Sequence, residues 1–153
     1  MPKEFSVSRS IEIAAPPERI TPLITDLHEW RRWSPWEDLD PDMERTYQGP
    51  DSGVGAVYAW RGNSKAGSGR MEVLEAVDTH VGIDLLFQSP MQGHNRIDFT
   101  LVPHGTTTRV EWLMTGPQNV VMRVMSRFWS MEKMVAPDFE RGLKKLKQVA
   151  ESA

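Results

Sequence analysis

Histidine is the side chain that most readily exchanges a proton near neutral pH, and this sequence contains four histidines. His28, His80, His94 and His104 lie far apart, and neither an HExxH pair nor another metal-ligand spacing joins them. The sequence therefore predicts no metal site. His94 differs from the others because it stands at the start of a predicted strand, near the mouth that we expect for an interior cavity. It is the histidine candidate for acid/base catalysis.

Glu75 is a second acid/base candidate, because it falls within a run of alternating residues that predicts a strand. Counting along that run places Glu75 on the same face as Met71 and Val73, which are apolar and expected to point inward. A buried carboxylate needs a partner of opposite charge, and Arg9 and Arg61 are the candidates. Most other carboxylates in the predicted strands fall on the opposite, solvated face.

Tyr58 is the third acid/base candidate. It shares one face of its predicted strand with Trp60, and each of these side chains carries a polar atom that could meet a ligand oxygen. Val57 and Ala59 compete for the inward position, so the pattern leaves open which face of this strand points to the interior.

Covalent and cofactor chemistry find little support in the sequence. The chain has no cysteine, so it has neither a thiol nucleophile nor a disulfide, and a reducing compartment is permitted. A G-x-S-x-G sequence, which would position a nucleophilic serine, is absent. Gly53 and Gly55 lack the third glycine and the following helix of a nucleotide-binding loop. We therefore expect no cofactor.

Large apolar side chains are unusually frequent, with six tryptophans and nine methionines. Trp30, Trp33 and Trp36 lie close together, and Ser34-Pro35 prevents one helix from carrying all three. Such residues suit a flat or irregular apolar ligand, because methionine adapts its shape and tryptophan offers a large surface. Each could equally belong to an ordinary core. The candidate ligand-binding residues are Trp33, Trp36, Tyr58, Trp60, Met71, Phe87, Phe99, Trp112, Met131, Met134, Val135 and Phe139.

A sheet must position these side chains, and its first strand is predicted from Phe5 to Ile13, where apolar residues alternate. Arg9 holds an inward position there, so it either reaches a mouth of the fold or pairs with a buried acid. The following Pro-Glu pair predicts a short helix to about Ile24, and a second short helix comes next. Six further alternating runs, separated by glycine- or proline-containing turns, are Glu44 to Gln48, Ala56 to Arg61, Arg70 to Val77, Val81 to Gln88, Arg96 to Val102 and Arg109 to Thr115.

These runs predict an antiparallel sheet of about seven strands with one apolar face, which something must cover. The stretch from Asn119 to Glu151 can cover it as one long helix, because its apolar residues recur at three- and four-residue steps. Pro137 should kink or restart this helix, and we expect the helix to move relative to the turn from Trp33 to Trp36. The predicted fold is therefore α+β: a helix-grip fold in one domain, 1–153, with a curved sheet wrapped on a long C-terminal helix.

Several short groups of residues keep a particular order and spacing along the chain. They are Ala15-Pro16-Pro17-Glu18, Trp30 with Trp33-Ser34-Pro35-Trp36, Gly53-Val54-Gly55-Ala56 before Tyr58 and Trp60, Thr108-Arg109-Val110 before Trp112, and Pro137-Asp138-Phe139-Glu140 with Gly142-Leu143 and Leu146-Lys147.

With the predicted element order, these groups resemble the SRPBCC (START/Bet v 1-like) superfamily, and within it the polyketide cyclase/dehydrase-like group. The resemblance covers essentially the whole chain. It implies a deep apolar cavity between the sheet and the C-terminal helix, which different members use for lipids, sterols, plant hormones or aromatic polyketides. Some members are enzymes and others are not.

Net charge and hydropathy narrow the class of partner. The net charge is −3, so no overall positive field would attract nucleic acid. The cations of the final helix are expected to form a solvated face, and neither a secretory signal nor a membrane-spanning run is found. We expect a cytoplasmic monomer or homodimer without integral membrane association.

Three hypotheses follow. The leading one is a protein that binds a hydrophobic small molecule, lipid-like or aromatic, in the cavity. The second is a polyketide cyclase or dehydratase in which His94, Glu75 or Tyr58 moves a proton. The third is a protein-interaction module with a filled interior and an exposed apolar patch.

Overall fold

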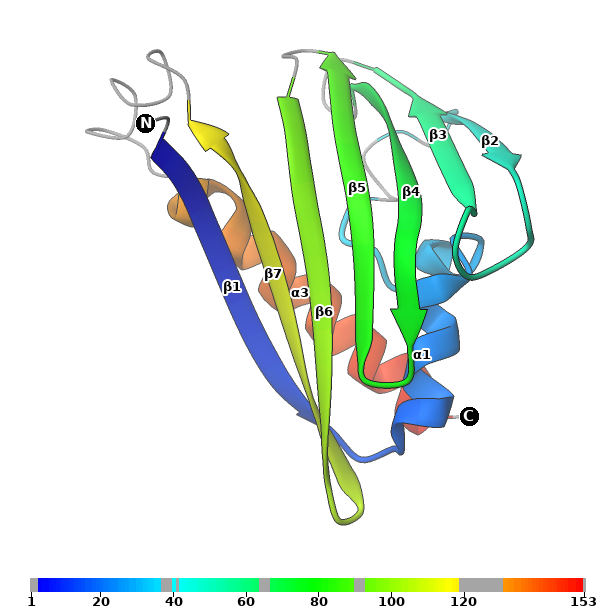
Figure 1. The fold of residues 1–153 in the computed structure, drawn as a ribbon, viewed down its shortest axis with the longest axis vertical. Coiled ribbons are helices and arrows are strands. Elements are labelled where there is room, and N and C mark those ends of the chain that lie inside the picture. Colours follow the sequence, from blue (N-terminus) through cyan, green and yellow to red (C-terminus); the bar gives the residue numbers. More distant parts are fainter. Residues whose placement is uncertain are drawn as a thin grey trace.

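The computed structural model describes residues 3–36, 40, 42–63, 67–89, 93–118 and 131–152. Within them, seven antiparallel strands form one curved sheet in the order β1-β7-β6-β5-β4-β3-β2. Two short helices follow the first strand and a long helix ends the chain (Figure 1), which confirms the predicted helix-grip fold. The elements are β1 (Lys3–Ile13), α1 (Pro17–Thr25), the 3-10 helix η1 (Glu29–Arg32), β2 (Glu44–Gln48), β3 (Val57–Arg61), β4 (Ser68–Val77), β5 (His80–Ser89), β6 (Gly93–His104), β7 (Thr107–Gln118) and α3 (Met131–Glu151).

Strands β6 and β7 are longer than the predicted runs, because they remain paired up to a tight turn. His104 lies opposite Thr107, so two residues connect the strands. Gly105 has a φ of 64°, in the left-handed region that glycine enters at little cost. Sequence periodicity ended these strands where the apolar residues stop, whereas backbone pairing continues beyond them.

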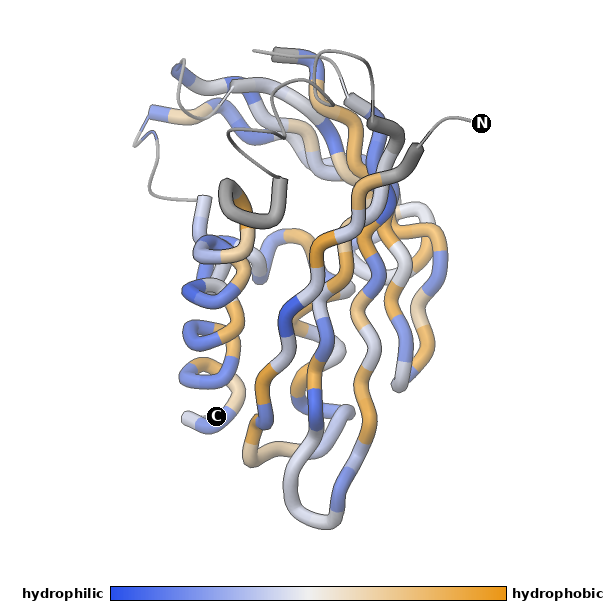
Figure 2. The backbone as a smooth tube through the Cα atoms, turned by 90° about the vertical axis from the view of Figure 1, so that its left-hand side faces the viewer, coloured by the Kyte–Doolittle hydropathy of each residue, from blue (hydrophilic) through white to orange (hydrophobic). Residues whose placement is uncertain are grey.

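The concave face of the sheet is covered by α3. Figure 2 shows hydrophobic residues on the side of α3 that faces the sheet and hydrophilic residues on the outer side. Phe139, Leu143, Leu146 and Ala150 are at most 1% exposed, and their spacing of four, three and four residues is that of one helix face. This stripe closes the core against β1 and β7.

The helix α3 runs without interruption through Pro137, so the predicted restart is wrong for the described residues. Proline lacks an amide hydrogen and therefore removes one backbone hydrogen bond. Ala136 on one side of Pro137 and Phe139 on the other are both buried in the same core, and this packing holds the helix together across the proline. The predicted start of the helix at Asn119 lies outside the described residues.

Candidate functional site

Residues directly opposite each other in neighbouring strands share a face of the sheet, so the pairing register arranges the concave side chains in rows. The lower row runs from Arg9 on β1 through Trp112 on β7 and Phe99 on β6 to Val81 on β5. An upper row, the Asn95 row, is defined by Phe5, Gly116, Asn95, Leu85, Met71, Tyr58 and Tyr47.

The lower row is filled by aromatic side chains that touch one another. Trp112 lies at the centre: its ring is parallel to that of Phe139, with centroids 4.2 Å apart, and Trp36 meets it edge-on at 5.7 Å. Trp30 and Trp33 pack edge-on against the same ring. We call this group the aromatic core; it consists of Trp30, Trp33, Trp36, Phe99, Trp112 and Phe139.

Two members of the aromatic core are fixed by the end of α1. The last carbonyl groups of a helix lack intrahelical partners. Trp30 Nε1 donates a hydrogen bond to the Ile24 carbonyl oxygen and Trp33 Nε1 donates to the Leu23 carbonyl oxygen, both at 2.8 Å. The Trp112 indole N–H, in contrast, is buried and has no hydrogen-bond acceptor among the described residues.

The turn after η1 contacts α3 closely. Trp36 Nε1 donates to Asp138 Oδ2 at 3.3 Å. A Cβ atom added at Gly142 would lie 2.9 Å from Pro35 Cδ and 3.0 Å from the Trp112 ring, so glycine is what allows the helix to approach this closely. Trp36 itself is half-buried, at the edge of the aromatic core.

Polar contacts attach the second half of α3 to β1. Arg9 Nε donates to Glu140 Oε1 at 3.1 Å, so the inward arginine has its carboxylate partner on the helix. The Ala14 amide donates to Glu151 Oε2 at 2.9 Å, and Glu151 also pairs with Lys147. The Ala14 hydrogen bond, and secondly that of Lys147, lower the pKa of Glu151 below its ordinary value. These contacts count against movement of this part of the helix.

Apolar side chains also line the Asn95 row and the positions beyond it, but several of them are only half-buried. Tyr58 is 5% exposed and lies opposite the buried Met71, so the face of β3 that carries Tyr58 is the inward one. Beyond it, Trp60 and Phe87 are half-buried and meet edge-on, with centroids 5.9 Å apart. Val135 on α3 is also half-buried. Large apolar side chains on this part of the concave face therefore keep part of their surface exposed.

Asn95 is a residue of this face that the sequence interpretation missed. It is 9% exposed and lies two and four residues before the buried Ile97 and Phe99, so it shares their inward direction. The alternation of β6, extended one residue toward its start, would have revealed it. The prediction began that strand at Arg96, and Asn95 was left outside.

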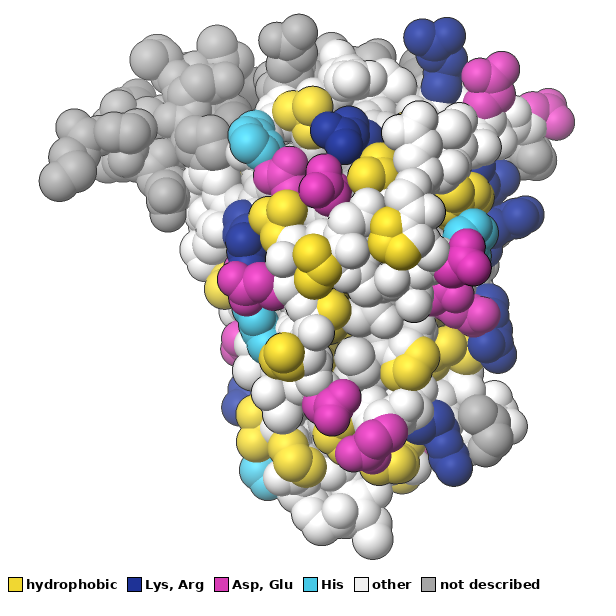
Figure 3. Space-filling view, turned by 45° about the vertical axis from the view of Figure 1, so that its right-hand side comes forward, with side chains coloured by type: hydrophobic (Ala, Val, Ile, Leu, Met, Phe, Trp, Pro, Cys, Tyr) yellow, Lys and Arg dark blue, Asp and Glu magenta, His cyan; other side chains and the backbone are white. Residues whose placement is uncertain are grey.

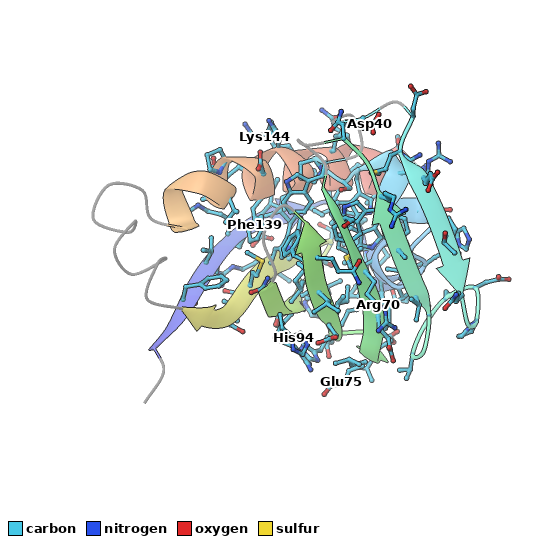
Figure 4. All side chains as sticks on the ribbon, turned by 90° about the horizontal axis from the view of Figure 1, so that it is seen from above. Asp40, Arg70, Glu75, His94, Phe139 and Lys144 are labelled. Atoms are coloured by element: carbon cyan, nitrogen blue, oxygen red, sulfur yellow. The ribbon has the colours of Figure 1, made fainter. Side chains whose placement is uncertain are left out.

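Glu75 does not point inward, and the prediction that it shares the face of Met71 and Val73 is wrong. Val73 lies opposite Ile83, but Glu75 lies opposite Gly82, because a β-bulge at Leu74 inserts one residue into β4. The extra residue reverses the alternation, so Glu75 emerges on the convex face (Figure 4). Its predicted partners are also wrong.

The actual partners of Glu75 form an ion-pair cluster on the convex face. Glu75 Oε2 lies 3.0 Å from His80 Nδ1, and Glu75 Oε1 lies 3.7 Å from an Arg96 nitrogen. His80 Nε2 is 2.8 Å from Asp98 Oδ1. Among the described residues, no group of three histidine, aspartate or glutamate side chains is placed to hold a metal ion. Glu75 is exposed and the other three side chains are half-buried, which favours a solvated structural role for the cluster.

His94 also lies on the convex face, exposed, with Nε2 2.5 Å from Asp84 Oδ1. His94 and Asn95 are successive residues of β6, so their side chains point to opposite faces of the sheet, and that of Asn95 points to the concave face. Figure 4 shows His94 and Glu75 on the side of the sheet opposite Phe139. Of the three acid/base candidates, Tyr58 is therefore the one that the structure places on the concave face.

The predicted ligand-binding residues thus fall into three groups. Trp33, Phe99, Trp112 and Phe139 are fully buried in contact with one another. The side chains of Met131 and Met134 lie outside the described residues. Of the others, Tyr58 and Met71 lie in the Asn95 row, Trp60 and Phe87 lie beyond it, and Trp36 and Val135 are half-buried against the core.

The outer surface offers no large apolar area on the side drawn in Figure 3, where acidic, basic, histidine and hydrophobic side chains are interspersed. The exposed large hydrophobic residues are distributed over loops and several strands: Val54, Leu74, Val77 and Val102. None of the described helices is long and apolar enough to cross a membrane.

A curved antiparallel sheet that grips a long C-terminal helix defines the Bet v 1-like class of helix-grip proteins. Residues 4–151 match the model of the family described as polyketide cyclase / dehydrase and lipid transport. The chain belongs to this family, which confirms the resemblance found in the sequence. Among curated proteins, no sequence matches the chain significantly.

Solved structures share the fold at low sequence identity. Norcoclaurine synthase from Thalictrum flavum, in complex with dopamine and hydroxybenzaldehyde, has a TM-score of 0.72 at 9% identity, over 99% of this chain and 88% of that one. Protein MLL2253 from Mesorhizobium loti has a TM-score of 0.66 at 21% identity, over 97% and 98%. The Aha1 dimer from Colwellia psychrerythraea has a TM-score of 0.60 at 18% identity, over 94% and 96%.

Proposed function

We propose that this protein binds a hydrophobic small molecule, lipid-like or aromatic, against the Asn95 row of the sheet. The observation that supports this most is the contrast between the two ends of the concave face. At one end the aromatic core is fully buried except for the half-buried Trp36; at the other, Trp60 and Phe87 are half-buried, as is Val135 on α3. Leaving large apolar side chains partly in water costs free energy that a ligand would recover.

The expected affinity follows from the area that such a ligand would bury. Burial of about 300 Å² of apolar ligand surface contributes about 7 kcal/mol before the entropic cost of association. One or two polar contacts would add orientation and selectivity. No catalytic group is needed for this function.

An acid/base enzyme is the less supported alternative. The family description includes cyclases and dehydrases, and such an activity would require a titratable group facing the ligand. Tyr58 is the remaining candidate, since His94 and Glu75 lie on the convex face. A single buried tyrosine offers weaker acid/base chemistry near neutral pH than a histidine or carboxylate pair would.

We propose that the protein acts in the cytoplasm. The cytoplasm is reducing, and a chain without cysteine does not depend on disulfides for its stability. We also propose one domain over residues 1–153, acting as a monomer or homodimer without nucleic acid. Light scattering with size-exclusion chromatography measures the oligomeric state, and limited proteolysis that leaves one resistant core supports the single domain.

Native mass spectrometry of the protein purified from its own host tests the proposed binding. The expected result is a co-purifying small molecule that denaturation releases. Thermal-shift screening against hydrophobic compounds complements it, because a ligand that binds the folded state raises the melting temperature. Absence of any adduct, together with no shift across the compounds, contradicts the proposal.

A further inference from the structure

Asn95 places a side-chain amide on the concave face of the sheet, among mainly apolar residues. The residue is 9% exposed, and its side chain forms no hydrogen bond with the described residues. Its amide nitrogen and oxygen are not among the fully buried polar atoms that lack a partner, so they still reach the surface of the concave face. Most residues on that face are apolar, so an accessible amide among them calls for an explanation.

The immediate surroundings of the amide are two glycines. A Cβ atom at Gly116 on β7 would lie 2.2 Å from Asn95 Oδ1, so any other residue there would displace the amide. On the other side, the Cβ position of Gly93 is 3.8 Å from Asn95 Nδ2. Both polar ends of the amide therefore lie over backbone positions that carry no side chain.

Neutral side chains make up the rest of the row. Phe5 flanks Gly116 on one side, and Leu85 lies opposite Asn95 on the other. Arg96 and His94, the sequence neighbours of Asn95, alternate to the convex face. A partner for the amide must therefore approach from the concave side, where the proposed ligand would lie.

Two cations whose side chains the structure describes on the concave face lie far from the amide. Arg9, at the β1 end of the lower row, is paired with Glu140 on α3. Arg45 lies opposite Trp60 on β2, four strands away from Asn95, which corresponds to about 19 Å at the usual strand spacing. Neither Arg9 nor Arg45 would therefore act as a counter-ion for a carboxylate bound beside Asn95.

We propose that Asn95 is a specificity-determining residue that hydrogen-bonds a neutral hydroxyl or carbonyl group on an otherwise apolar ligand. This inference rests on the proposed binding function. A carboxamide both donates and accepts, so it matches either group. It selects a neutral polar group over a plain hydrocarbon and over a carboxylate.

Three probes with the same ring system test the selectivity: 2-naphthol, 2-methylnaphthalene and 2-naphthoate. Each is titrated against the protein loaded with N-phenyl-1-naphthylamine, a neutral fluorophore whose displacement is measured. The variants are Asn95→Leu, which removes the amide at similar size, and Gln88→Leu, the matched control at an exposed amide on β5.

The wild type and Gln88→Leu are expected to prefer 2-naphthol over both other probes, by about 3- to 10-fold over 2-methylnaphthalene, the range for one hydrogen bond. Asn95→Leu is expected to lose that preference, with each displacement corrected for the variant's own affinity for the fluorophore. Retention of the preference in Asn95→Leu overturns the role of Asn95 but leaves the binding function intact. If the wild type binds neither the fluorophore nor any of the three probes, the binding function fails, and this inference with it.

A second measurement does not depend on how the variant folds. In ¹⁵N–¹H spectra of the wild type, selectively labelled at asparagine, the Asn95 side-chain NH₂ resonances should move further on saturation with 2-naphthol than with 2-methylnaphthalene, because both rings shift them but only the hydroxyl group forms a hydrogen bond. Equal movement with both probes, or none with either while both bind, contradicts a hydrogen bond to the ligand.

Discussion

The ring of Phe139 on α3 lies parallel to the ring of Trp112 on β7, with centroids 4.2 Å apart and 5° between the planes. Both side chains are fully buried. This stacked pair joins the helix to β7, the strand next to the edge strand β1, and lies within the filled part of the concave face.

Phe139→Ala should be among the most destabilising substitutions in the chain. Removing a fully buried phenylalanine loses its transfer free energy and leaves a cavity against Trp112, at a cost of about 3 to 5 kcal/mol. Urea denaturation measures the free energy of unfolding. Val77→Ala, at a residue that is 60% exposed, is the control and should change it by less than about 0.5 kcal/mol. A loss below about 1 kcal/mol for Phe139→Ala would mean that the ring pair is not tightly packed.

Gly142→Ala should destabilise the protein, against the usual preference of helices. In an exposed helix the change stabilises by about 1 kcal/mol. Here the added methyl group would lie 2.9 Å from the Pro35 ring and 3.0 Å from Trp112, and overpacking of this kind costs about 1 to 3 kcal/mol. Lys144→Ala, on the exposed side of α3 (Figure 4), is the control. A higher melting temperature for Gly142→Ala would show that the contact is looser than described.

Glu151 should make stability depend on pH in the acid range. Its pKa is lowered in the folded state by the Ala14 amide and Lys147, so the unfolded chain takes up a proton first as the pH falls. The stabilisation is therefore present above the ordinary pKa of 4.5 and disappears as the pH falls through the lower folded value. Urea midpoints at pH 7 should be higher for the wild type than for Glu151→Gln, and the difference should be smaller at pH 3. Glu44→Gln, at an exposed position on β2, is the control. A difference between the wild type and Glu151→Gln that is unchanged at pH 3 would contradict this linkage.

Trp60→Ala should separate binding from stability. Trp60 is half-buried at the edge of the Asn95 row, so its removal should weaken N-phenyl-1-naphthylamine binding by about 10-fold while costing less stability than Phe139→Ala. Fluorescence titration measures the affinity and denaturation the stability. Leu74→Ala, at the exposed bulge residue, provides the comparison and should leave the affinity unchanged. Equal affinities of Trp60→Ala and the wild type would place the ligand elsewhere.

The fold could be predicted from the sequence because alternation and helical periodicity are local properties. The first strand, the six following strands and the amphipathic end of the chain each carry their own pattern, and short turns leave few ways to connect them. The seven-stranded sheet and the covering helix were therefore predicted correctly.

The candidate site was less predictable, because it depends on single-residue shifts and on tertiary contacts. The bulge at Leu74 reverses the direction of Glu75, and nothing in the apolar-polar pattern around it marks the insertion. Trp33 and Trp112 belong to the predicted apolar set, but their mutual contact depends on how the turn packs against the helix. Asn95 lay one residue before the predicted strand and was missed.

The most direct test of ligand binding at the Asn95 row is to map a bound probe by nuclear magnetic resonance. Titration of ¹³C-methyl-labelled protein with 2-naphthol should shift the methyl resonances of Leu85 and Met71, which lie in that row. Those of Val77 and Val102, both exposed, should stay in place. Shifts confined to the exposed methyl groups, or no saturable shift at Leu85 and Met71, would contradict the account.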